Sequence, residues 1–82
     1  MDKVIYLVDY LVKQIVKYPE RVSVELGVDE ENFSAININV DEKDMGSIIG
    51  KAGNVANAIR TIAQATAYAN GEKKVKVNIN SI

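Results

Sequence analysis

The sequence predicts an α+β protein, a two-layer sandwich in which helices cover one face of a three-stranded sheet. Two kinds of periodicity support this class. Apolar residues near the N-terminus recur at helical spacing, whereas three later segments alternate apolar and polar residues as half-buried strands do. The elements follow in the order helix, strand, strand, helix, helix, strand. The apolar faces of the three strands can therefore share one helical layer.

The first helix is predicted from an apolar stripe that begins soon after the N-terminus. Asp2 can cap this helix, and the Tyr18-Pro19 pair ends it. The stripe consists of Val4, Leu7, Val8, Leu11, Val12, Ile15 and Val16. Charged side chains occupy the opposite side of the helix, so the stripe is expected to face the core.

Two strands should follow, separated by a turn at Gly27 and residues 29–32. In the first strand Val22, Val24 and Leu26 alternate with polar residues. In the second, Ile36, Ile38 and Val40 point one way, and Asn37 and Asn39 point the other. Alternation of this kind is typical of a sheet with one buried and one open face.

The second half of the chain is predicted to hold two helices and the last strand. Asp41 can cap a short helix over about residues 42–49, and Asn54 can cap a longer one over about 55–69. The Asn70-Gly71 pair should stop the longer helix. Its predicted apolar stripe is Val55, Ile59, Ile62 and Thr66, and the last strand places Val75, Val77 and Ile79 on one face.

Composition limits the classes of function. The chain has 82 residues, which favours a single domain over 1–82, and it has neither cysteine nor histidine. Disulfides and thiolate metal sites are thereby excluded, and the commonest general base is missing. We expect no metal and no cofactor. No stretch approaches the ~18 apolar residues of a membrane span, and no signal peptide is recognisable. These features predict a soluble, cytoplasmic protein.

The two halves of the chain differ in charge although the net charge is only −1. Residues 1–42 carry four basic and nine acidic side chains, whereas residues 43–82 carry six basic and two acidic ones. This asymmetry suggests that the C-terminal half faces an anion and that the N-terminal half is solvated.

Gly50-Lys51-Ala52-Gly53 is the most informative motif. A short bend between two helices leaves backbone N–H groups free at the start of the second helix, where the helix dipole also favours negative charge. Glycines without side chains let a phosphate backbone approach closely. The N–H groups from Lys51 to Asn54 are therefore candidate donors to phosphate, and Lys51 adds a positive charge.

The element order with this bend resembles a type II KH domain, an α-β-β-α-α-β module with a mixed sheet. The apolar-Ile-Gly-x-x-Gly pattern is matched by residues 48–53, and the run Ala56-Asn57-Ala58-Ile59-Arg60-Thr61-Ile62 is similar to the KhpA family of small bacterial KH proteins. Residues 18–24 also resemble that family's Asn-Pro-(Glu/Asp)-x-Val-x-Val segment, with Tyr18 in place of the asparagine. Asn54 stands where such proteins often have a basic residue.

The resemblance implies a non-catalytic protein that grips single-stranded RNA and acts in post-transcriptional regulation or as an RNA chaperone. The bases are expected over a groove whose apolar floor is formed by Ile48, Ile49, Val55 and Ile38, although each of these side chains can equally belong to the core. The full set of expected RNA-binding residues is Ile38, Lys43, Ile49, Gly50, Lys51, Ala52, Gly53, Asn54, Val55, Asn57 and Arg60. No aromatic residue belongs to this groove, so base stacking is not expected and binding should be weak.

A weak single site favours a dimer. Residues 61–71 carry no charge, and alternate alanines at 63, 65, 67 and 69 allow another helix to approach. The expected dimer surface is Ile62, Ala65, Thr66, Tyr68 and Ala69. The resemblance implies self-pairing, pairing with a larger Jag-type multi-domain KH protein, or both. Helix propensity alone could also explain the alanines.

Two other functions compete with RNA binding. A P-loop enzyme is disfavoured because the motif needs Ser or Thr after the lysine, and Ala52 stands there. The remaining alternative is a protein–protein adaptor that keeps the scaffold with weak or lost RNA binding, which the acidic N-terminal half and Asn54 support.

Overall fold

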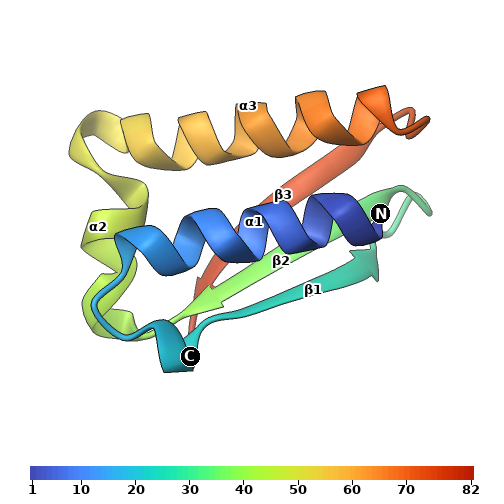
Figure 1. The fold of residues 1–82 in the computed structure, drawn as a ribbon. Coiled ribbons are helices and arrows are strands. Elements are labelled where there is room, and N and C mark those ends of the chain that lie inside the picture. The colour runs from blue at the N-terminus through green and yellow to red at the C-terminus, as the bar shows by residue number, and fades with distance from the viewer.

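The computed structural model describes residues 1–82, and its helices and strands follow the predicted order, with short 3-10 turns (η) between some of them (Figure 1). The elements are α1 (Asp2–Ile15), η1 (Pro19–Arg21), β1 (Ser23–Val28), β2 (Ser34–Val40), η2 (Glu42–Asp44), α2 (Met45–Ile49), η3 (Lys51–Gly53), α3 (Asn54–Ala69) and β3 (Val75–Ser81). No helix is long and apolar enough to cross a membrane.

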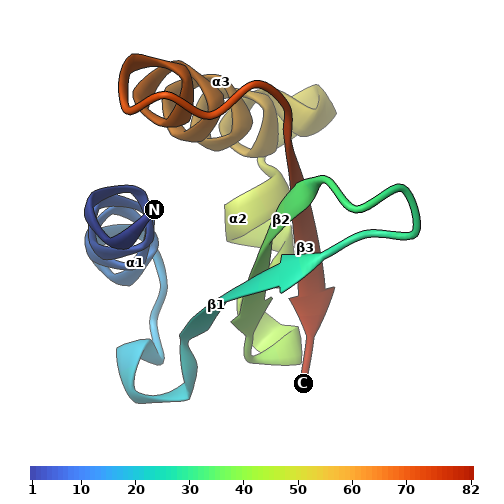
Figure 2. The same ribbon diagram turned by 90° about the vertical axis from the view of Figure 1, so that its right-hand side faces the viewer.

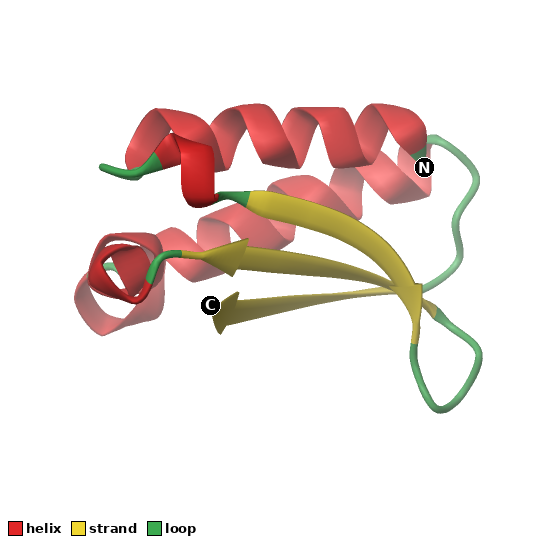
Figure 3. Ribbon diagram, turned by 90° about the horizontal axis from the view of Figure 1, so that it is seen from below, coloured by secondary structure: helices red, strands yellow, loops and turns green.

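The sheet is mixed and is covered on one face only. Its strand order is β1-β2-β3, with β1 antiparallel and β3 parallel to β2. Helices α1 and α3 lie side by side over the same face, and the β1–β2 hairpin projects away from them (Figure 2). Seen from below, the strands lie uncovered in front of the helices (Figure 3). The predicted two-layer α+β sandwich is therefore confirmed.

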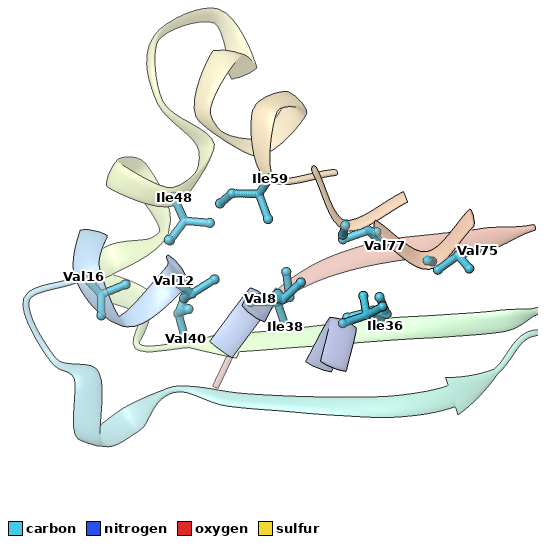
Figure 4. Close-up of a cluster of buried hydrophobic side chains, with 13 residues drawn as sticks. Val8, Val12, Val16, Ile36, Ile38, Val40, Ile48, Ile59, Val75 and Val77 are labelled. Carbon is cyan, nitrogen blue, oxygen red and sulfur yellow. The ribbon is translucent and has the colours of Figure 1, made fainter. Parts of the chain in front are cut away.

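The core lies between β2 and the two long helices. Ile36, Ile38 and Val40 of β2 have no exposed surface. In Figure 4 these three side chains face Val8 and Val12 of α1. The alternation predicted for the second strand is thus confirmed, and β2 is the strand around which both layers are organised.

The buried face of α3 differs from the predicted one. Its buried residues are Ala56, Ile59, Ala63 and Ala67. Of the predicted stripe only Ile59 lies in the core, since Ile62 is 42% exposed and Thr66 and Val55 are half-buried. The physical reason is size: α3 lies close beside the valine face of α1, and alanine leaves room for that approach where a larger side chain would not.

Several predicted helix ends and turns also need correction. Neither Asp2 nor Asn54 is a cap, because each is the first residue of its helix and no side chain caps either one. Ile15 is the last residue of α1 and is 40% exposed. Gly27 belongs to β1 rather than to the turn, and a Cβ there would lie 2.9 Å from Asn37 Nδ2.

Two predicted helix signals are confirmed. Asp41 accepts a hydrogen bond from the backbone N–H of Lys43 (2.8 Å) at the start of η2. At the other end of the chain, Gly71 takes a φ of +93°, and the N–H of Glu72 reaches back to the carbonyl of Ala67 (3.0 Å). This pairing, with the bond from the N–H of Gly71 to the carbonyl of Tyr68, is a Schellman stop.

One buried carboxylate joins the end of α1 to the start of α2. Asp44 is 3% exposed and accepts hydrogen bonds from the backbone N–H groups of Lys17 (2.9 Å) and Tyr18 (3.0 Å). A charged acceptor strengthens both bonds. Asp44 thereby fixes the chain after α1 against the helix that leads to the Gly-x-x-Gly bend.

We expect Asp44→Ala to lower the free energy of unfolding by about 2–4 kcal/mol, because it leaves two poorly solvated N–H groups without a partner. Glu42→Ala, in the same turn but exposed, should change stability by less than about 0.5 kcal/mol. Urea denaturation of both variants measures the difference. Equal effects would show that Asp44 does not hold this junction.

A second carboxylate orders the β1–β2 turn. Asp29 Oδ1 accepts hydrogen bonds from the N–H groups of Phe33 (2.8 Å) and Glu31 (2.9 Å), and Oδ2 lies 3.1 Å from Lys76 Nζ on β3. The hydrogen bond from Phe33 is the main cause that holds the pKa of Asp29 below its ordinary value of 3.8. The same pair raises the pKa of Lys76.

This pair predicts a pH dependence. Because the pKa of Asp29 is lower in the folded than in the unfolded state, the ionised side chain stabilises the fold at pH values above the unfolded-state pKa. This contribution is lost as the pH falls below 3.8 and through the folded-state pKa. The stability of Asp29→Asn should therefore fall less steeply between pH 5 and pH 2 than that of the unaltered protein. Urea midpoints across that range measure it, and parallel curves would contradict it.

Candidate nucleic-acid interface

The Gly-x-x-Gly bend has an unusual backbone. Gly50, Ala52 and Gly53 have φ values of +74°, +56° and +76°, in the left-handed region. Ala52 adopts this conformation without being glycine, which costs of order 1 kcal/mol and is typical of functional loops. The bend sits between α2 and α3 at one end of the molecule (Figure 1).

The two glycines serve different purposes. A Cβ at Gly50 would lie 2.4 Å from Cγ2 of Val55 and 3.0 Å from its backbone nitrogen, so the loop packs tightly on the first turn of α3. A Cβ at Gly53 would meet nothing nearer than Asn57 Nδ2 at 3.9 Å. Gly50 therefore sets the loop's shape, and Gly53 leaves open space above the backbone.

Two of the four expected phosphate donors are already used inside the loop. The N–H of Gly53 donates to the carbonyl of Gly50 (3.2 Å), and that of Asn54 donates to the carbonyl of Lys51. None of the backbone bonds of the turns and loops uses the N–H of Lys51 or Ala52. The set of free donors is therefore smaller than the sequence suggested, and it lies at the exposed tip.

The positive charges near the bend are not paired with carboxylates. The three ion pairs are Lys13–Asp9, Arg21–Asp41 and Lys76–Asp29. Lys51 is exposed on the loop, and exposed Lys43 lies before α2 with Nζ 5.8 Å from the centre of the Tyr18 ring. Unpaired cations of this kind are available to an anionic ligand.

Two side-chain nitrogens of Arg60 already donate hydrogen bonds within the protein. Its Nε donates to the carbonyl of Val77 on β3 (3.4 Å), and its Nη1 donates to Asn57 Oδ1 (3.1 Å). One turn later, Gln64 Nε2 donates to the carbonyl of Val75 (3.0 Å). Sequence reasoning missed Gln64, although its spacing from Arg60 places both on one face of a helix.

The other expected RNA-binding residues are divided between surface and core. Ile49, Ala52, Asn54 and Asn57 are exposed, and Val55 is half-buried. Ile38 and Ile48, by contrast, have no exposed surface and belong to the core cluster. The expectation that Ile38 forms part of the groove floor is wrong. Its side chain lies on the helix-covered face of β2 and therefore presents no surface to a ligand.

The expected dimer surface lies on the outer side of α3. Ile62 (42%) and Tyr68 (50%) are largely exposed, and Ala65 and Ala69 are exposed as well. The Thr66 hydroxyl donates to the carbonyl of Ile62 (2.8 Å), which satisfies it within the helix. Ala63 and Ala67 face the core, so only alternate alanines contribute to this surface.

No group of three His, Cys, Asp or Glu side chains lies close enough to hold a metal ion. Tyr6 and Tyr10 are exposed on α1, and Tyr68 lies at the far end of α3 from the bend.

Solved structures similar to this one include two of the protein Era. One is Aquifex aeolicus Era Y63A bound to GDP·AlF4−, with a TM-score of 0.65. The other is Era in complex with MgGDPNP and nucleotides 1506–1542 of 16S ribosomal RNA, with a TM-score of 0.66. Both are 20% identical to this chain, cover 96% of it and are matched over 30% of their own length. They support the fold alone.

Sequence comparisons identify relatives of nearly the same length. The RNA-binding protein KhpA of Clostridium perfringens is 39% identical over 69 residues, which are 84% of this chain and 91% of that protein. The RNA-binding protein KhpA of Streptococcus pneumoniae serotype 4 is 32% identical over 82 residues, 98% of each chain. The family described as KhpA/KhpB, KH domain, matches residues 6–79. The chain therefore belongs to the KhpA/KhpB family of KH-domain proteins.

Proposed function

We propose that this chain is a non-catalytic RNA-binding protein that holds the backbone of single-stranded RNA at Gly50–Gly53. The observation that carries the proposal is the exposed bend itself. It combines the N–H groups of Lys51 and Ala52 with open space above Gly53 and a lysine that has no carboxylate partner. The RNA-binding names of the relatives support the same ligand.

The bound segment should be short and the affinity low. A KH loop clamps about four backbone nucleotides, and no exposed aromatic lies beside this bend to stack on a base. We expect a dissociation constant of about 1 μM or weaker, which corresponds to about −8 kcal/mol. We propose that residues 1–82 form one KH domain, which acts on RNA in the cytoplasm, in post-transcriptional regulation.

Replacing Lys51 and Ala52 together by aspartate should weaken RNA binding by at least about tenfold, since it puts two negative charges where phosphate is expected. Fluorescence anisotropy with labelled oligouridine measures the affinity. The matched control is Lys3→Asp with Asn32→Asp, which changes the net charge equally at the opposite end of the molecule.

The two outcomes separate RNA binding at this loop from its alternatives. If the loop variant and the control lose affinity equally, the effect is one of net charge and the loop is not the site. If neither the unaltered protein nor the control binds the labelled oligouridine, the adaptor function is supported instead.

We further propose that the outer face of α3 pairs two KH domains, from a second copy of this chain or from a Jag-type multi-domain KH protein. Ile62, Ala65 and Ala69 form an uncharged exposed surface on which small residues allow close helix packing. Linking two weak sites would raise the effective affinity for one RNA.

Ala65→Glu should shift the sedimenting species to the 9.0 kDa monomer, because it places a charge in the middle of this surface. Gln14→Glu, on the exposed side of α1, introduces the same charge and should leave the mass unchanged. A dimer that survives Ala65→Glu would exclude α3 as the contact.

A further inference from the structure

The two edges of the sheet are not protected in the same way. At the β3 edge, side chains of α3 reach the strand, since Arg60 and Gln64 donate to the carbonyls of Val77 and Val75. At the β1 edge no side chain hydrogen-bonds the backbone of residues 23–28; the one side-chain bond there joins Ser23 to Glu25. An edge strand with unpaired N–H and C=O groups is a template for another strand.

An apolar cleft lies directly beside this open edge. It has a volume of about 440 Å3 and is lined by Asp2, Ile5, Tyr6, Asp9, Val24 and Leu26. The cleft lies between the N-terminal part of α1 and strand β1, which supply all of its lining residues. Tyr6, Leu26 and Val28 are 75%, 51% and 69% exposed, a concentration of apolar surface that single scattered residues do not explain.

The two charged side chains that line the cleft, Asp2 and Asp9, are both acidic. Asp2 forms no ion pair, whereas Asp9 is paired with Lys13 (3.0 Å). This acidic rim repels phosphate. It also disfavours a second copy of this chain, because β1 pairing with β1 about a two-fold axis would bring two acidic rims together.

We propose that the α1–β1 cleft is a docking site for an extended segment of a partner protein that alternates apolar and basic residues. The segment adds to the β1 edge as a fourth strand, through main-chain hydrogen bonds. Its apolar side chains enter the cleft beside Tyr6 and Leu26, and its basic side chains meet the acidic rim. This site lies at the other end of the molecule from the Gly-x-x-Gly bend (Figure 1), so a segment there leaves the bend open.

The probe is a fluorescein-labelled synthetic peptide of about six residues, the length of an average strand, in which valine and lysine alternate. We expect it to bind the unaltered protein at least ten times more tightly than two control peptides. One control replaces lysine by glutamate and the other replaces valine by serine, so that the charge and apolar requirements are separated.

Variants locate the site. Leu26→Asp and Tyr6→Ser should each weaken the peptide at least fivefold, and Tyr6→Ser is the milder test because the side chain is 75% exposed on a helix. Ile82→Asp, which alters an exposed apolar residue outside the cleft, should have no effect. Hydrogen exchange should slow at the outward N–H groups of β1 when the peptide binds, because strand addition buries them.

Five results would each overturn the proposal. The peptide does not bind, or it binds equally well when valine is replaced by serine. Alternatively, its NMR shift changes map to Lys51–Gly53 instead of β1, which would show charge attraction to another site. A change of the β1 signals with protein concentration alone would identify a second copy as the occupant. Perturbation of the cleft by oligouridine would identify RNA.

Discussion

The fit of the alanine face of α3 beside the valine face of α1, both above β2, is the constraint on which the rest of the structure depends. Ala63, Ala67, Val4 and Val8 all have no exposed surface. Side chains this small bring the two helices close, so that one three-stranded sheet suffices to complete the core. The start of α3 then has a fixed place, and the bend that precedes it is held on both sides. Asp44 fixes the start of α2 through its hydrogen bonds with the chain after α1, and Val55 packs against Gly50.

The two glycines of the bend differ in what a side chain at their position would meet. Gly50 is needed by the protein, because a side chain there would collide with Val55. The space around Gly53 is not filled by the protein itself, so it is open to another molecule. Ala52 in the left-handed region shows that the loop keeps a conformation that its sequence does not prefer locally. Such strain persists because the helices on both sides dictate the path of the chain.

The sequence predicted the fold well where periodicity was strong and less well where size mattered. Ile36, Ile38 and Val40 alternate so regularly that the buried face of β2 is unambiguous. In α3, hydrophobicity favoured Ile62 over Ala63, whereas close helix packing buries the smaller residue. The bend between two helices was predicted correctly, whereas the RNA-binding roles of Lys51 and Arg60 stay predictions. The contacts of Arg60 and Gln64 with β3 were not, because they depend on which sheet edge lies beneath α3.

The side-chain caps on β3 have a consequence for assembly. Endless head-to-tail growth of a sheet requires two free edges that complement each other, so that β1 of one molecule can pair with β3 of the next. Arg60 and Gln64 occupy the carbonyls of Val77 and Val75 on one of these edges, whereas no side chain hydrogen-bonds the backbone of the β1 edge. These two side chains therefore hinder the pairing of β1 of one molecule with β3 of the next. They work against fibre growth in a sheet whose other edge is open, as proline or a bulge does in other proteins.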